Sequence, residues 1–347
     1  MPIPNSSLSA HEHLTFLSGS PERLKLLVEL QQRALSSAEL ETHTEISYET
    51  IQRLLEAGIE RDWIAEQIES ECYALTAAGD LVLQAYFDAE PLDRDLLTFL
   101  VTSMTRLRVL EELRGDSLSA VELNEHISVT HPTVYRALHS LEERGLLDWQ
   151  QDPELTPTGM DTYEAYRLLA DTIAWITNYA TVLNQLGDIA RTLPAQALAR
   201  GSEELVVNSM AHPDAVLDHF EARISDRSSE RIQAVLPSMC AFVDRIRRPL
   251  LEDGTEIEAI IDEAVLEVAR TSYPRVLDSV TDAESAELLV HPEKLQFGLA
   301  ILDDSVFVFA YTDQSLLACI ETASDALGTW AVDVYQTHHR AASRWNS

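Results

Sequence analysis

The sequence predicts an α+β protein with two similar helical domains in tandem, a long linking helix and a C-terminal domain of mixed α/β structure. Three observations support this prediction. The segment 36–55 aligns with 119–138 and matches it at glutamate, leucine, histidine, threonine and arginine positions. The phrase LTAAG at 75–79 returns as LTPTG at 155–159. From about residue 195, runs rich in valine and isoleucine alternate with amphipathic segments, as strands and helices do in an α/β domain.

The second repeat has the signals of three helices, a hairpin and a further helix. Apolar residues at helical spacing run from Leu97 to a glycine at 115 and predict one helix. Ser119 and Glu122 have the spacing of a capping box at the start of a short second helix. Segment 131–145 predicts a third helix with a proline in its first turn, and 146–156 predicts two short strands.

The first repeat has the same parts. Pro21 opens its first helix, Ser37 caps the second, and YETIQRLLEAG at 48–58 forms the third. The segment between the third helix and the LTxxG phrase is longer in the first repeat than in the second, which predicts a longer hairpin in the first repeat.

Together the repeats resemble archaeal winged helix-turn-helix transcription regulators. The resemblance rests on SAVELNEHISVTHPTVYRALHSLEERGLL at 119–147 and on the LTPTG that follows, and it extends over about residues 14–190. It implies that the third helix of a motif lies in the major groove of DNA. The expected domains are a first winged helix (1–95), a second winged helix (96–160), a linking and dimerisation helix (161–194) and an α/β effector or oligomerisation domain (195–347).

The charge is strongly acidic, with 58 Asp and Glu against 25 Lys and Arg and a formal net charge of -33. The 46% hydrophobic content is that of a folded protein rather than of a disordered acidic chain. A halophilic cytoplasm explains the charge, because at molar salt the Debye length is about 3 Å and self-repulsion is screened. The composition resembles that of haloarchaeal proteins.

Location follows from what the chain lacks. No apolar run reaches the length of a membrane span, and the polar N-terminus does not have the pattern of a signal peptide, so we expect a cytoplasmic protein without membrane contact. Cys72, Cys240 and Cys319 are isolated, which fits a reducing compartment and argues against a thiolate zinc site.

Charge also distinguishes the two repeats. Residues 126–141 contain no acid, whereas the third helix of the first repeat holds Glu49 and Glu56 and its hairpin is acidic. The second repeat is therefore the predicted principal reader of double-stranded DNA, and Arg106 and Arg108 lie in another acid-free segment. The candidate contacts are Thr130, His131, Thr133, Tyr135, Arg136 and His139.

The corresponding residues of the first repeat are weaker candidates, because this motif is equally compatible with a partner-binding or purely structural winged helix. For either repeat, contacts to phosphate contribute little affinity at molar salt, so contacts to bases and recognition of DNA shape must supply the binding free energy. The candidate DNA-binding residues here are Tyr48, Thr50, Gln52 and Arg53.

The linking helix has apolar residues alternating by three and four, the spacing of a two-helix seam. This predicts a homodimer that would match a palindromic operator. The alternative is that the helix packs on the C-terminal domain of its own chain. The seam residues are Tyr166, Leu169, Ile173, Ile176, Ala180 and Leu183.

The C-terminal domain resembles that of archaeal regulators of the methanogenesis-filament and TrmB type, most closely from Gly298 to the end of the final helix. The resemblance implies a ligand-sensing or oligomerising domain with a fold like that of phospholipase D. Phosphodiesterases of that fold use HxK, but His291 and Lys294 stand as HPEK, so we expect no enzyme activity. Strand-end residues are candidates for a small-molecule effector pocket, with turns and helix caps as the alternative: Asn208, Asp262, His291 and Asp303.

Two histidine-rich groups are weak candidates for a metal site. His11, Glu12 and His13, and likewise His338 and His339, are neighbours that point to different helix faces, so no metal site is expected. No glycine-rich phosphate-binding phrase predicts a cofactor. The sequence thus favours a dimeric, sequence-specific DNA-binding transcription regulator. A tandem winged-helix adaptor for protein partners is the alternative.

Overall fold

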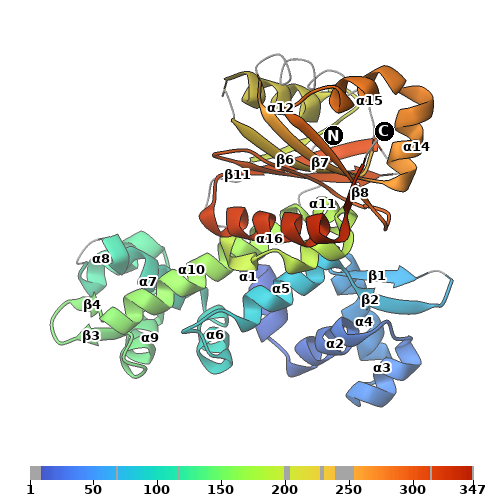
Figure 1. Ribbon diagram of the computed structural model, residues 1–347. Helices are drawn as coiled ribbons and strands as arrows, with labels where there is room; N and C mark the ends of the chain where they lie inside the picture. The colour runs from blue at the N-terminus through green and yellow to red at the C-terminus, as the bar shows by residue number, and fades with distance from the viewer. Residues whose placement is uncertain are drawn as a thin grey trace. The chain divides into compact units, whose positions relative to one another are not determined.

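The computed structural model describes residues 9–67, 69–115, 118–198, 204–226, 230–238, 254–312 and 315–345. The chain divides into two compact units, the first ending at Asn178 and the second beginning at Tyr179 (Figure 1). Each unit is described separately.

The N-terminal unit contains one order of elements twice. The first copy consists of α1 (Ala10–Ser18), α2 (Pro21–Gln32), α3 (Ser37–Thr44), α4 (Tyr48–Ile59), β1 (Ile64–Gln67), β2 (Cys72–Leu75) and α5 (Ala77–Phe87). The second consists of α6 (Arg94–Val101), α7 (Met104–Gly115), α8 (Ala120–Ile127), α9 (His131–Glu142), β3 (Leu147–Trp149), β4 (Pro153–Leu155) and α10 (Pro157–Asn178). Both strand pairs are antiparallel, and β1–β2 is the longer hairpin, as predicted.

The second helix of each trio begins and ends in the same way in the two copies. Ser36, one residue before the predicted cap Ser37, and Ser119 both form a capping box with the glutamate three residues later. At the other end, Glu45 (φ 58°) and Ser128 (φ 56°) adopt the left-handed conformation that turns the chain into the third helix. The repeat seen in the sequence is thus a repeat of backbone geometry.

The single helix predicted from Leu97 to Gly115 is wrong. It is two helices, α6 and α7, with the chain turning at Thr102 and Ser103. In a continuous helix the Phe99 carbonyl would accept from the Ser103 N–H. Instead it accepts from the Arg106 guanidinium at 2.7 Å, and the Ser103 N–H donates to the carbonyl of Leu100. The first copy has the matching extra helix, α1, which the sequence patterns did not predict.

The repeated LTxxG phrase is the joint between hairpin and last helix. In the second copy the Thr156 hydroxyl donates to the carbonyl of Gly145 (2.7 Å) and accepts from the N–H of Gly159 (3.0 Å). Gly145 has φ 69° and ends the turn before β3. Gly159 lies against the Leu146 backbone, and a Cβ there would lie 1.8 Å from that carbonyl oxygen. The phrase is therefore structural.

The first copy builds the same joint. Thr76 bonds to the Asp62 carbonyl (2.7 Å) and accepts from Gly79 (3.1 Å), and Asp62 has the left-handed φ of 57°. A Cβ on Gly79 would lie 2.3 Å from the Trp63 carbonyl oxygen. In both copies only glycine lets the helix approach the strand backbone this closely.

The linking helix predicted at 161–194 is wrong in length. Helix α10 ends at Asn178, and α11 (Ala180–Gln185), η1 (Gly187–Thr192) and η2 (Ala195–Ala197) follow in the second unit. Near the break, the β-branched Thr177 bonds through its hydroxyl to the carbonyl of Ile173 (2.8 Å) and accepts from the Trp63 indole (3.2 Å).

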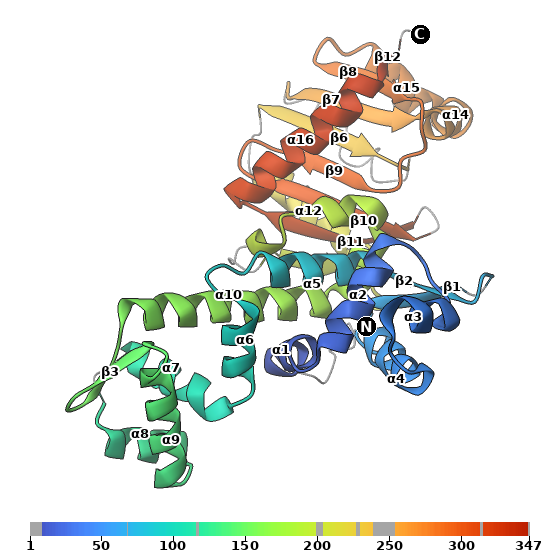
Figure 2. The same cartoon turned by 90° about the horizontal axis from the view of Figure 1, so that it is seen from below.

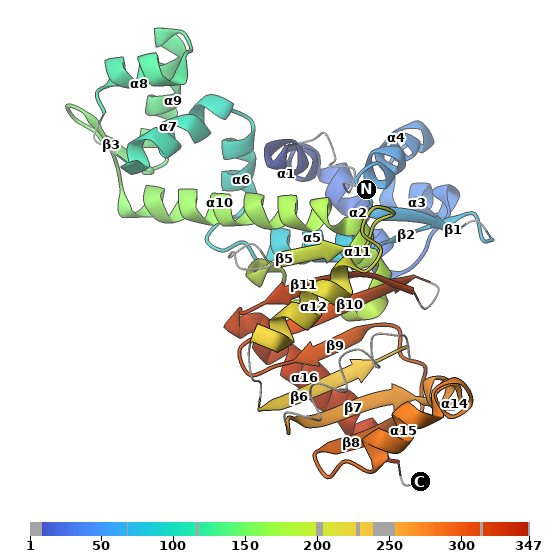
Figure 3. The ribbon, with the colours of Figure 1, turned by 90° about the horizontal axis from the view of Figure 1, so that it is seen from above.

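The six seam residues are buried within the chain itself. Helix α10 packs on α1, α5 and α7, and α7, α8 and α9 of the second repeat lie toward one of its ends in all three views (Figures 1–3). A seam already filled by the chain's own helices is not available to a partner's helix. The residues concerned are Tyr166, Leu169, Ile173, Ile176, Ala180 and Leu183, each at most 8% exposed.

The C-terminal unit is a mixed sheet between helices, as predicted. Eight strands of the described chain follow the order β12-β8-β7-β6-β9-β10-β11-β5, with β6, β7 and β8 parallel and the other pairs antiparallel. The strands are β5 (Glu204–Val207), β6 (Arg231–Leu236), β7 (Glu256–Asp262), β8 (Ala286–His291), β9 (Gly298–Ile301), β10 (Val306–Thr312), β11 (Ser315–Thr322) and β12 (Ser343–Arg344).

Helices cover both faces of this sheet. Helix α16 (Asp325–Ala341) lies on one face (Figure 2), and α12 (Ala215–Asp226), α14 (Glu263–Ser272) and α15 (Pro274–Thr281) lie on the other (Figure 3). The amphipathic sequence of 228–251 predicts a helix, but Arg231–Leu236 is strand β6. Its alternating exposed and buried residues let it pair with β7 and β9, and tertiary pairing outweighs helix propensity here. Residues 239–251 of that prediction lie outside the described chain.

Gly159→Ala is expected to lower the free energy of unfolding by about 3 kcal/mol, because the new methyl group overlaps backbone that cannot rotate away. Gly115→Ala is the matched control in the same unit, since nothing lies within 4 Å of a Cβ there. Thermal unfolding at molar KCl measures both variants. Equal melting temperatures for Gly159→Ala and wild type would contradict this account of the joint.

Candidate nucleic-acid interface and C-terminal pocket

The exposed face of α9 carries the side chains expected to contact DNA. Val134, Leu138 and Leu141 are buried, which turns the intervening positions outward. His131, Arg136 and His139 are exposed at positions along this helix, while Thr130 is exposed at its N-cap. The hydroxyl groups of Thr130 and Thr133 hydrogen-bond to each other at 2.8 Å. The structure therefore brings the second-repeat candidates together on one helix and its N-cap.

Trp149 on β3 belongs to the same surface and was missed by the sequence analysis. Its ring lies 5.1 Å from that of Tyr135 and 4.8 Å from that of His139, and Tyr135 lies 4.2 Å from His131. Tyr135 is accordingly half-buried rather than fully exposed. The signal was available, because His131, Tyr135 and His139 are spaced by four residues, which places them on one helical stripe.

Arg136 and the two arginines of α7 have different environments. The Arg136 Nε donates to the carbonyl of Pro132 (3.2 Å), and the side chain is otherwise exposed. Arg106 stacks on Phe99 at 3.9 Å, and burial lowers its pKa. Arg108 donates to the carbonyl of Ile127 at 3.3 Å. Arg106 thus serves packing, while Arg108 and Arg136 are both exposed.

The first repeat presents an acidic surface at the corresponding helix, α4. Tyr48 is 54% exposed and Arg53 is exposed, but the Gln52 amide donates to the Ser37 hydroxyl (2.8 Å) and ties α4 to α3. The Thr50 hydroxyl accepts from that of Ser47 at 3.0 Å. Exposed glutamates surround these four candidates, two on α4 and three on or beside the hairpin: Glu49, Glu56, Glu66, Glu69 and Glu71.

The four strand-end candidates of the C-terminal unit do not form one site. Asp262 and His291 are partners at the carboxyl ends of β7 and β8. Asn208 follows β5, at the far edge of the sheet. Asp303 follows β9, which runs antiparallel to β6, so it lies at the opposite end of the strands. Only the first two are brought together.

Each of the four makes hydrogen bonds to backbone. The Asp262 carboxylate accepts from the N–H groups of Val265 (2.8 Å) and Leu295 (3.0 Å) and so caps α14. The remaining bonds join Asn208 to the Leu316 carbonyl and the Val216 N–H, Asp303 to the Glu230 N–H, and His291 to the backbone of Glu293. These bonds fit the alternative of turns and caps.

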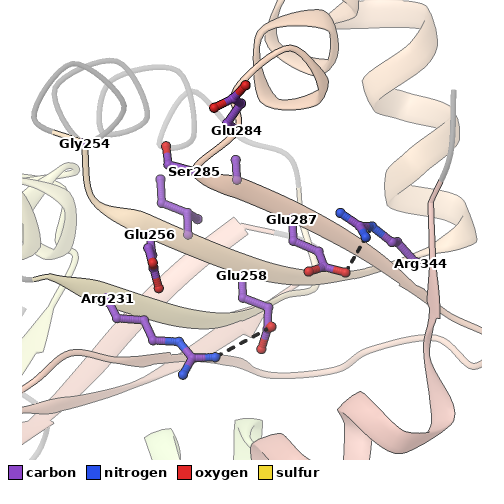
Figure 4. Close-up of a pocket in the computed structure, with 10 residues that line it drawn as sticks. Arg231, Gly254, Glu256, Glu258, Glu284, Ser285, Glu287 and Arg344 are labelled. Carbon is purple, nitrogen blue, oxygen red and sulfur yellow. Dashed lines mark ion pairs between the residues drawn. The ribbon is translucent and has the colours of Figure 1, made fainter.

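A pocket of about 390 Å³ lies instead at the amino ends of β6, β7 and β8 (Figure 4). It is polar, with Arg231 3.7 Å from Glu258 and Arg344 3.2 Å from Glu287. None of the four predicted residues lines it. The lining residues are Arg231, Gly254, Glu256, Ile257, Glu258, Glu284, Ser285, Ala286, Glu287 and Arg344.

Glu258 is the most connected side chain of this pocket. It accepts hydrogen bonds from the Tyr335 hydroxyl on α16 and from the Gln233 amide (3.1 Å). Burial alone would raise the pKa of Glu258, but these hydrogen bonds outweigh it and hold the pKa below its usual value. The carboxylate raises the pKa of Tyr335, in addition to the larger effect of burial. The floor of the pocket therefore carries a fixed negative charge.

A second polar cluster joins α12 to the sheet. His219 Nε2 lies 2.6 Å from the Glu321 carboxylate, and Arg223 bonds both to Glu321 (3.0 Å) and to Glu204 (3.2 Å). Glu204, His219 and Glu321 converge as metal ligands would. The Arg223 guanidinium already occupies the positive position between the two carboxylates, so the arrangement is that of an ion-pair network.

The histidines considered in the sequence contact other groups of the protein. His11 Nδ1 lies 3.3 Å from the Tyr166 hydroxyl, and His338 Nδ1 lies 2.9 Å from the Val334 carbonyl oxygen. Burial against α10 and the nearby Arg61 lower the pKa of His13 to about 4.

Among the described helices, none combines the length and the apolar character needed to span a bilayer.

The ranges that match known protein families coincide with the two repeats and lie within the C-terminal unit. Residues 11–96 and 94–177 each match the HVO_A0261 N-terminal domain. Residues 213–341 match the middle domain of FilR1, a methanogenesis regulatory protein. The resemblance of the C-terminal domain to regulators of this type is thereby confirmed. No curated protein matches the sequence.

Solved structures with partial similarity include TrmBL2, an archaeal chromatin protein, at 13% identity and a TM-score of 0.32, covering 70% of this chain and 94% of that one. NucT from Helicobacter pylori (13%, TM-score 0.35) covers 42% of this chain and 99% of its own. The phospholipase D family member Nuc from Salmonella typhimurium (12%, TM-score 0.31) covers 42% and 100%. TM-scores of this size do not establish a shared fold.

Asp262→Ala is expected to lower the free energy of unfolding by about 2 kcal/mol, because two backbone N–H groups lose their acceptor and one of them begins α14. Asp304→Ala, at an exposed aspartate, is the control and is expected to change stability by less than about 0.5 kcal/mol. Chemical denaturation at molar KCl compares them. An Asp262→Ala variant as stable as the control would show that this carboxylate does not serve as a cap.

Proposed function

We propose that this protein is a DNA-binding transcription regulator in which α9 of the second repeat reads the major groove as part of a winged helix-turn-helix. The observation that carries the proposal is the face of α9, which lies in a segment free of acid (126–141) and exposes Arg136 and the candidate threonine and histidine side chains. In a chain of net charge -33, an acid-free surface is a surface kept compatible with phosphate. The match to a domain of the regulator FilR1 supports the same function.

The first repeat has a different role in this proposal. Its Tyr48, Thr50 and Arg53 occupy the positions of His131, Thr133 and Arg136, but the surrounding glutamates would repel the DNA backbone. We propose that the first repeat has a structural role or contacts a protein partner. The alternative function of a protein adaptor therefore applies to this repeat alone. The second repeat is the reader.

The finer parts of the proposal concern assembly and control. A twofold dimer would match a palindromic operator, but it needs a surface other than the closed α10 seam. Light scattering at molar KCl tests it. A small-molecule effector would bind in the polar pocket at the amino ends of β6 to β8 rather than at the predicted carboxyl ends.

We further propose that the protein is cytoplasmic and halophilic. We propose that it is not an enzyme, since its HPEK phrase departs from the HxK motif of the phosphodiesterases.

The test is selection of genomic DNA by the purified protein at molar KCl. Wild type is expected to enrich one motif, and Thr133→Ala combined with Arg136→Ala is expected to lose it, with a cost of about 1–3 kcal/mol for each good base contact. The matched control, Thr50→Ala with Arg53→Ala in the first repeat, is expected to retain the motif. Folded wild-type protein that enriches nothing would sink the proposal and favour the adaptor.

A further inference from the structure

The second repeat carries four aromatic rings in contact, a feature that the first repeat lacks. The aromatic stripe consists of His131, Tyr135 and His139 on α9 and Trp149 on β3, joined by ring-centroid distances of 4.2, 5.1 and 4.8 Å. At the aligned positions the first repeat has Tyr48, Gln52, Glu56 and Glu66. The two repeats thus share backbone and the Thr–Arg pair, but the first repeat has an aromatic ring at one of these four positions, Tyr48.

The aromatic stripe lies at the surface, and the acids of the hairpin strands lie on the face opposite Trp149. His131 and His139 are exposed, and Tyr135 and Trp149 are half-buried. Asp148 and Glu154 are cross-strand partners, and since side chains alternate along a strand they lie on the hairpin face opposite Trp149. Glu142, at the end of α9, lies 3.5 Å from His139 Nδ1 and marks one end of the aromatic stripe.

Cations are few on this surface. Between residues 126 and 149 the arginines are Arg136 and Arg144, and Arg144 stacks on Phe99 at 4.2 Å. Both arginines are exposed, and two cations offer only a weak counterion-release contribution, which molar salt reduces further. Rings that pack on deoxyribose and on thymine methyl groups release no counterions, so salt does not weaken their contribution in the same way.

We propose that the aromatic stripe is a contact surface for duplex DNA that holds helix and hairpin together as one reading element and supplies salt-tolerant affinity. The inference rests on the proposed function and deepens it. Trp149 is its central residue, because it touches both Tyr135 and His139 and links β3 to α9. Duplex DNA fits this surface because α9 also exposes Arg136 beside the rings, with Thr130 exposed at its N-cap, and both side chains can contact base edges or phosphates.

The test is the affinity for the duplex that wild type selects, measured by fluorescence anisotropy over a range of KCl concentrations. Wild type is expected to show a slope of log K against log [KCl] shallower than about −2 per chain. Trp149→Glu, which installs the residue of the first repeat, is expected to lose at least about tenfold in affinity at every salt concentration. Trp149→Phe keeps a ring and is expected to bind within a fewfold of wild type.

Two further variants separate contact from folding. His131→Ala with His139→Ala removes exposed rings and leaves the hairpin in place, and it is expected to weaken binding severalfold without lowering the melting temperature. Glu66→Trp is the control in the first repeat and is expected to leave affinity unchanged.

The outcomes are distinct. Unchanged affinity in both Trp149→Glu and the double histidine variant would overturn the inference and leave the proposed function standing. The inference is also overturned if Trp149→Glu loses binding only together with folding while the histidine variant binds normally. If wild type selects no duplex, the proposed function fails and this inference fails with it.

Discussion

The contact on which the N-terminal unit depends is the close approach of a glycine to a strand backbone at the end of each repeat. Gly159 lies against the Leu146 carbonyl, and the Thr156 hydroxyl bridges the same turn to the first turn of α10. This joint sets the direction in which α10 leaves the hairpin. Helix α10 can then bury its apolar seam against α1, α5 and α7, so a local contact between glycine and backbone governs how both repeats pack.

Charge is the second constraint, and it acts on function rather than on fold. A protein of net charge -33 can contact DNA only through a surface that lacks acidic residues, and residues 126–141 of the second repeat contain none. Because molar salt weakens phosphate contacts, affinity must come from surfaces that salt does not screen. The acid-free segment 126–141 and the aromatic stripe meet both requirements, while the first repeat keeps the same backbone with an acidic exterior.

Much of this architecture could be predicted because local rules carry it. Capping serines, the LTxxG phrase and period-two strands predicted the repeated elements and most of the mixed sheet. The failures are of another kind. The break at Thr102 and Ser103 depends on Arg106 reaching the Phe99 carbonyl, and β6 depends on its neighbours in the sheet. The closed seam of α10 and the position of Asp303 depend on tertiary packing and strand direction, which periodicity alone does not encode.

Hydrogen–deuterium exchange of the full chain, with and without its selected duplex at molar KCl, tests the central claim most directly. This account predicts slower exchange over His131–Glu142 and Leu147–Trp149 when DNA is bound, with Tyr48–Ile59 unchanged. Protection confined to Tyr48–Ile59, or no protection at a saturating concentration of duplex, would contradict the assignment of the second repeat as the reader.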